Sequence, residues 1–223
     1  MVDRLDVRRE DGVRTIAFDR PEKRNALDVP LVEDLRAELD DAEADGNDAI
    51  LFTGTGPVTT AGADTSVVGG DDDAAKRALV EGVNDVYAFL ARYPRPTVMA
   101  VKGAAIGAGF QLAVACDFAI AGDDAVLSKP EIGYGVFSGY STRMLKHALG
   151  ANIAREIALR GEEIPPERAL EWGVVSDVVS SDAVDERAHD LVTTLAEYDD
   201  AAYKHTKAAL SFDGSPADFE NYP

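Results

Sequence analysis

The sequence predicts an α/β fold, built as one domain with a helical C-terminal part. Strand-like and helix-like segments alternate through the first half of the chain, and helices dominate after Gly150. No linker or low-complexity stretch interrupts the 223 residues, and 46% of them are hydrophobic, which excludes a disordered chain. A chain of this length buries roughly 70% of its unfolded surface.

Strand signals come from short apolar runs. The segments typical of strands are residues 13–18, 49–53, 97–101 and 118–120, with weaker signals at 174–175 and 178–179. The runs at 49–53 and 97–101 are continuously apolar, as expected of strands covered on both faces. These runs therefore predict a sheet with helices on both sides.

Helix signals lie between and after these strands. Asp28 is placed to cap a helix with Pro30 in its first turn, since Leu31, Leu35 and Leu39 then share one face. A second predicted helix ends before Pro94 and has Leu79, Val83, Val86 and Leu90 on one face. Further helices are predicted over 107–116 and 183–195. A short helix begins at Pro165-Pro166 and stops at Gly173. Residues 211–223 carry only weak structural signals.

The charge balance restricts the partners. The chain has 41 Asp and Glu against 22 Lys and Arg, a net charge of −19, so nucleic acid and a bare anionic membrane surface are excluded as partners. The carboxylates are spread along the sequence, which favours a salt-accumulating cytoplasm over an ordinary acidic protein. The charged N-terminus and the absence of an 18-residue apolar stretch predict a soluble, cytoplasmic protein.

The cysteine and the three histidines do not indicate a disulfide framework or a metal site. The single cysteine, Cys116, excludes an internal disulfide framework and lies in an apolar run, so it is predicted to be a small buried residue. His147, His189 and His205 fall in polar helical segments without metal-ligand spacing and are predicted to lie on the surface. We therefore expect no metal site.

Two glycine-rich segments, 54–64 and 103–109, each follow a buried strand. Neither is a nucleotide fingerprint. At such turns free backbone N–H groups point outward, and two converging turns would form an oxyanion hole; the alternative is simple tight packing. A third segment, 128–133, places Glu131 beside a proline in apolar, glycine-bearing sequence. Glu131 is therefore either a desolvated acid–base group or an ordinary solvated carboxylate.

These segments occur together and in order with two others. The set is Arg20-Pro21-Glu22-Lys23-Arg24-Asn25-Ala26-Leu27, residues 53–64, residues 102–117, Lys129-Pro130-Glu131 and residues 169–175. From about residue 13 to 210 the chain resembles the crotonase superfamily, the enoyl-CoA hydratase/isomerase family. The resemblance implies a spiral of ββα units, with a core over 1–180 that carries the acyl-CoA site and a shortened C-terminal helical segment over 181–223. It also implies an acyl-CoA substrate, no cofactor apart from the coenzyme A of that substrate, and a homo-oligomer, a trimer or a dimer of trimers.

The resemblance also assigns the site. The oxyanion donors would be the backbone N–H groups of Ala63 and Ala108. Ala108 stands where the family usually has glycine, which requires a negative φ. The coenzyme A moiety would lie along two segments, whose matching residues are Lys23, Arg24, Ala26, Leu27, Ala61, Ala63 and Asp64, with Ala108 beside them.

The departures from the family pattern bear on the reaction. Hydratases of the family have two glutamates, and this chain has Gln111 and Glu131 at those positions. Glutamine orients water but exchanges no proton near neutral pH, so the pair resembles the Δ3,Δ2-enoyl-CoA isomerase arrangement with Glu131 as the base. The alternatives are an enoyl-CoA hydratase, another crotonase-type reaction, or a non-catalytic acyl-CoA binder. After Glu131 the family usually has Pro-Gly-x-Gly-Gly, whereas this chain reads Ser138-Gly139-Tyr140-Ser141-Thr142. We therefore expect Tyr140 or Ser141 to reshape the acyl pocket or to supply a polar group of its own.

Overall fold

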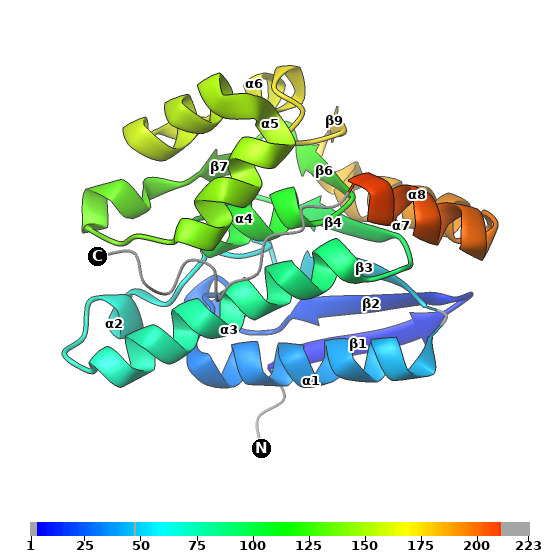
Figure 1. The fold of residues 1–223 in the computed structure, drawn as a ribbon, viewed down its shortest axis with the longest axis horizontal. Helices are drawn as coiled ribbons and strands as arrows, with labels where there is room; N and C mark the ends of the chain where they lie inside the picture. Colours follow the sequence, from blue (N-terminus) through cyan, green and yellow to red (C-terminus); the bar gives the residue numbers. More distant parts are fainter. Residues whose placement is uncertain (1–3, 47, 211–223) are drawn as a thin grey trace.

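The computed structural model describes residues 4–46 and 48–210, and its two sheets confirm the predicted α/β fold (Figure 1). The larger sheet has the order β1-β2-β3-β4-β6-β9, in which β1 and β2 are antiparallel and all other neighbours are parallel. Its strands are β1 Leu5–Glu10, β2 Val13–Phe18, β3 Ala49–Gly54, β4 Thr97–Val101, β6 Phe118–Gly122 and β9 Asp177–Val179. The smaller sheet contains β5 Ala104–Ile106, β7 Val126–Ser128 and β8 Glu163–Ile164.

Helices cover both faces of the larger sheet. Along β3, Ile50 and Phe52 belong to one hydrophobic cluster and Leu51 to another, because successive side chains of a strand point to opposite faces. The first cluster includes residues of α1 Val29–Asp45, α3 Asp73–Arg92 and α4 Ala108–Ala115. The second is closed by α7 Val184–Ala196. The predicted sheet covered on both sides is therefore confirmed.

The predicted start of the first long helix is also confirmed. Asp28 is the N-cap of α1, and its side chain accepts a hydrogen bond of 2.9 Å from the Leu31 N–H. Leu31, Leu35 and Leu39 are at most 2% exposed. The remaining helices are α2 Thr65–Val68, α5 Gly139–Arg160, α6 Pro166–Glu171 and α8 Asp200–Leu210.

Several elements were not predicted from the sequence, among them the smaller sheet, α2 and α8. β1 was not predicted, because its residues alternate between charged and apolar without an apolar run. Val174 and Val175 are buried but lie outside β9, which begins at Asp177. The prediction for residues 211–223 falls outside the described residues.

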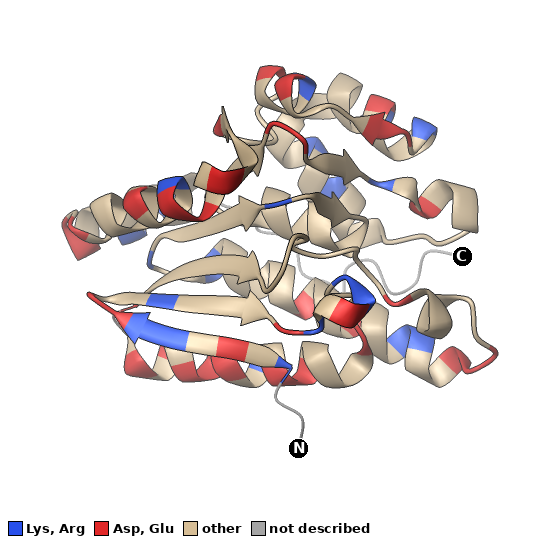
Figure 2. Cartoon of the chain, turned by 180° about the vertical axis from the view of Figure 1, so that it is seen from behind, with Lys and Arg blue, Asp and Glu red and all other residues tan. Residues whose placement is uncertain are grey.

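Cys116 and the three histidines lie as the sequence predicted. Cys116 is buried and free, and burial raises the pKa of its thiol well above the ordinary value. His147, His189 and His205 are exposed. Asp and Glu positions are spread over helices and loops on the face drawn in Figure 2. None of the helices in the described part of the chain is long and apolar enough to cross a membrane.

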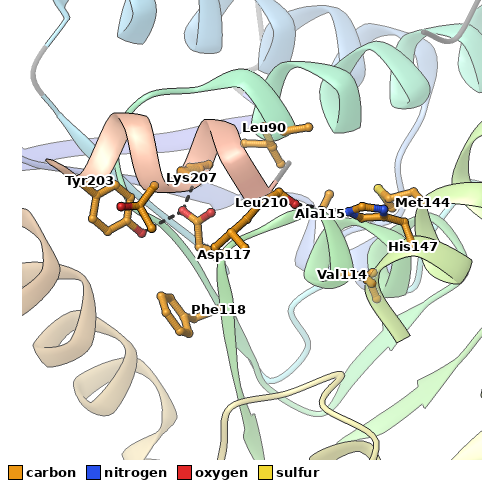
Figure 3. A pocket seen from close by; sticks show the side chains of 13 residues that line it. Leu90, Val114, Ala115, Asp117, Phe118, Met144, His147, Tyr203, Lys207 and Leu210 are labelled. Carbon is orange, nitrogen blue, oxygen red and sulfur yellow. Dashed lines mark hydrogen bonds and ion pairs between the residues drawn. The ribbon is translucent and has the colours of Figure 1, made fainter. Parts of the chain in front are cut away.

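A partly buried carboxylate anchors α8. Asp117 accepts hydrogen bonds from the Lys207 ammonium (2.8 Å) and the Tyr203 hydroxyl (3.2 Å) of α8, and from the Thr97 N–H (2.8 Å). These side chains lie beside a cavity of about 560 Å³ between α8, α4 and α5 (Figure 3). Because both α8 side chains and the Thr97 N–H donate to the same oxygen, Oδ2, this carboxylate attaches α8 to β4.

A buried arginine joins β2 to α1. The Arg14 guanidinium, 0% exposed, contacts Glu38 (2.5 Å), Asp45 (2.7 Å) and Asp48 (3.1 Å). The pKa of Arg14 is raised overall: desolvation, which would lower it, is outweighed by hydrogen bonds to these carboxylates. The hydrogen bond from Arg14 lowers the pKa of Asp45.

We expect Arg14→Met to lower the free energy of unfolding at neutral pH by about 1–3 kcal/mol, since several charge-assisted hydrogen bonds are lost. The Asp45 carboxyl has a lowered folded pKa, so its contribution is complete above the ordinary carboxyl pKa and is lost as the pH falls through the folded value. The difference between wild type and variant should therefore shrink in acid. Chemical unfolding at several pH values measures it, and the exposed Arg160→Met is the control that should change little. Equal stability of Arg14→Met and wild type at neutral pH would contradict this account.

Candidate active site

Two loops at the carboxyl ends of the strands are joined by backbone hydrogen bonds. Leu27 N–H donates to Gly62 O, and Asp64 N–H donates to Leu27 O, each at 2.8 Å. Ala61 N–H donates to Arg24 O at 2.9 Å. A second connection pairs Thr60 with Ala105 of β5. The structure therefore brings together the segments 24–27 and 61–64 that the sequence assigned to coenzyme A.

Asn25 organises the first loop, a role that sequence reasoning missed. Its side chain is 0% exposed, and its Oδ1 accepts from the Arg20 N–H at 2.8 Å. Its Nδ2 donates to the carbonyls of Val58 (2.7 Å) and Thr55 (3.0 Å). Arg24 and Asn25 both have positive φ, of 53° and 55°. Asn tolerates this conformation better than most residues, so the Arg-Asn pair in the motif is the signal that identifies it.

The residues predicted to follow coenzyme A differ in exposure. Lys23 and Arg24 are exposed, whereas Ala26 and Leu27 are buried. Asp64 is the N-cap of the short helix α2 and accepts from the Ser66 N–H at 3.0 Å. The two bases are thus free to meet an anionic ligand, while the alanine, the leucine and the aspartate shape the loop.

The two backbone donors predicted for the oxyanion hole lie on adjacent segments. A Cβ added to Gly62 would overlap the Ile106 carbonyl oxygen and would lie 3.4 Å from the Ala108 nitrogen. In the described part of the chain, the Ala63 and Ala108 N–H groups donate to no backbone or side-chain acceptor. Ala108 is the first residue of α4 and is not among the residues with positive φ, which confirms the conformation required there. Both donors are therefore available to a ligand oxygen.

Both residues line one cavity of about 190 Å³. Its wall is mostly apolar, and α3 supplies one side of it with Leu79, Val83 and Tyr87. The other sequence-predicted residues that line it are Ala61, Gln111 and Glu131. Glu131 is the only carboxylate among its described lining residues.

Glu131 is held by its neighbours. It lies in the 3-10 helix η2, Pro130–Tyr134, and its side chain is 16% exposed. Its Oε1 accepts a hydrogen bond from Gln111 Nε2, and the Glu131 Oε2 atom is buried without a hydrogen-bond partner. A Cβ added to Gly107 would lie only 3.3 Å from Oε1. Gln111 and Glu131, which stand where hydratases of the family have two glutamates, are therefore in direct contact.

Tyr87 supports the same end of the cavity. Its hydroxyl donates to the Ala108 carbonyl at 2.9 Å. Burial, and secondarily the negative charge of Glu131, raises the pKa of Tyr87 well above its ordinary value. Tyr87 therefore stays a neutral hydrogen-bond donor.

The structure corrects the expectation for Tyr140 and Ser141. They are 1% and 0% exposed in the first turn of α5, and neither lines the cavity. Ser138, which precedes the helix, lines it instead and accepts a hydrogen bond of 2.8 Å from the Ser141 hydroxyl. Because these residues lie in the first turn of α5, their side chains turn toward the core.

The chain is similar to known proteins over most of its length. The profile of the family described as enoyl-CoA hydratase/isomerase matches residues 8–220. The chain is 34% identical to 2,3-dehydroadipyl-CoA hydratase of Escherichia coli over 212 residues, which cover 92% of this chain and 81% of that protein. It is 30% identical to trans-2-decenoyl-(acyl-carrier-protein) isomerase of Streptococcus mutans over 204 residues, 89% of this chain and 78% of that protein.

A solved structure extends the similarity to the fold. The crystal structure of an enoyl-CoA hydratase/isomerase from Xanthobacter autotrophicus superimposes with a TM-score of 0.85 at 32% identity. The match covers 94% of this chain and 79% of that one.

Proposed function

Because the chain belongs to the enoyl-CoA hydratase/isomerase family of enzymes, we propose that it moves the double bond of a 3-enoyl-CoA thioester to position 2, with Glu131 as the single base. One observation carries this proposal. The described lining of the cavity offers one carboxylate, and the second acid position holds Gln111, in contact with it.

The reaction needs one proton carrier. The Glu131 carboxylate takes a proton from C2, and the electron pair of that C–H bond spreads over the dienolate to the thioester oxygen. The Ala63 and Ala108 N–H groups stabilise this oxygen where its charge develops, together with the N-terminal dipole of α4. The Glu131 carboxylic acid then returns the proton to C4, and the double bond forms between C2 and C3.

Gln111 assists without exchanging a proton. Its amide donates to Oε1, which fixes the plane of the carboxylate beside the cavity. Hydration across a 2-enoyl ester would require a base for water and an acid for the α-carbon at the same time. A glutamine supplies neither near neutral pH.

The test compares 3-enoyl-CoA and trans-2-enoyl-CoA side by side. The assay is run in molar KCl, because we also propose that the net charge of −19 suits a salt-rich cytoplasm. We expect faster turnover of the 3-enoyl ester. Gln111→Glu should raise hydration of the 2-enoyl ester by about 10²-fold or more, since it restores the second acid. Faster hydration than isomerisation by the wild-type enzyme would assign the chain to the hydratases instead.

A further inference from the structure

A buried lysine lies directly behind the base. The Lys129 side chain is 4% exposed, and its Nζ lies 3.5 Å from Glu131 Oε2. Burial lowers the pKa of Lys129, and the Glu131 carboxylate opposes that effect. Lys129 does not line the cavity that Glu131 faces. The ammonium therefore contacts the carboxylate from the side away from the substrate.

Other shielded lysines of the chain have additional acceptors. Lys207 donates to Asp117 (2.8 Å) and to the Arg95 carbonyl (3.2 Å), and Lys102 donates to Asp185 (2.7 Å) and the Gly54 carbonyl (2.9 Å). Among the described residues, Glu131 is the one acceptor that faces the Lys129 ammonium. A buried pair with so few hydrogen bonds contributes little to stability, because desolvation of the two charges offsets their attraction. Stability alone does not account for a lysine at this position.

We propose that Lys129 is a positioning residue, which holds the Glu131 carboxylate in its orientation toward the cavity from behind. The inference rests on the proposed function, since it assumes that Glu131 is the base. Gln111 holds Oε1 and Lys129 faces Oε2, so the two neighbours constrain the carboxylate from both oxygens. Lys129 itself neither gains nor loses a proton during turnover.

The test replaces the ammonium by an uncharged chain of similar length. Displacement of a catalytic group by about 1 Å can cost about 10²-fold in rate. For Lys129→Met we therefore expect kcat to fall about tenfold or more, with KM nearly unchanged. Lys129→Arg should restore most of the rate, and Lys207→Met is the control for loss of another buried ion pair. Each variant is assayed with the enoyl-CoA ester that the wild-type enzyme turns over faster.

A double-variant cycle with Glu131→Gln separates the two proposals. If Lys129 acts through Glu131, adding Lys129→Met to Glu131→Gln should cause no further loss of rate. A wild-type kcat for Lys129→Met, or an equal loss in both backgrounds, would overturn the role of Lys129 while leaving the base in place. Full turnover by Glu131→Gln would instead overturn the proposed function.

Discussion

Glu131→Gln should reduce kcat by about 10³-fold while binding of the coenzyme A ester changes little. The substitution keeps the shape of the side chain and an acceptor for Gln111, but removes the group that accepts the proton. Acid–base groups in direct contact with the reacting atoms typically contribute 10²–10⁴ in rate. The loops at 24–27 and 61–64, on which ester binding is proposed to depend, do not include residue 131.

Steady-state kinetics and direct titration with a non-reacting acyl-CoA measure the two effects separately. Glu163→Gln is a matched control, because this exposed glutamate lies on β8 opposite Ser128 and outside the cavity. Comparable turnover by Glu131→Gln and Glu163→Gln would refute the single-base mechanism. Equal weakening of binding and of kcat by Glu131→Gln would point to a structural role for this residue.

Gly62→Ala should be the second most damaging change. Gly62 has φ of +81°, and an added Cβ would overlap the Ile106 carbonyl oxygen beside Ala108. The two loops would have to separate, which displaces the Ala63 N–H from the Ala108 N–H. Loss of one oxyanion donor typically costs about 10²–10³ in kcat, and we expect a fall of this size.

The control for Gly62→Ala is Gly12→Ala. Gly12 has a similar φ of +76°, but no atom lies within 4 Å of the position of its Cβ. Gly12→Ala should lower the free energy of unfolding by only about 1–2 kcal/mol, because a residue with a Cβ is strained in the left-handed backbone region. It should keep its kcat. If Gly62→Ala retains wild-type kcat, the oxyanion hole does not depend on the contact between these loops.

The local sequence patterns were sufficient for most of the sheet and its helices. The apolar runs of β3 and β4 and the leucines of α1 are buried because their periods match their secondary structures. β1 was missed because its charged residues lie at the edge of the sheet, where one side needs no apolar partner. The Asp11-Gly12 pair, both with positive φ, is the turn signal that would have revealed this hairpin.

The site was predictable where a short motif carries it, and less so where its parts meet through tertiary contacts. The resemblance of the ordered motifs to the family assigned Glu131, Ala63 and Ala108 from the sequence, whereas the Pro-Glu segment and the glycine turns alone left other interpretations open. Nothing in the sequence around Lys129 shows that its ammonium is buried against the base, because β7, η2 and α4 must first come together. Burial of a charged group is a property of the assembled core.

The two edges of the larger sheet have a consequence for the behaviour of the protein in concentrated solution. β1 forms one edge and carries Asp6, Arg8, Arg9 and Glu10, with an ion pair of 2.6 Å between Arg8 and Asp6. The opposite edge, β9, is only three residues long, and its Asp177 pairs with Arg187 of α7. Unpaired strand edges are templates for aggregation unless they are short or charged. Both edges meet one of these conditions, so the fold resists sheet-to-sheet association even at salt concentrations that screen the repulsion between acidic surfaces.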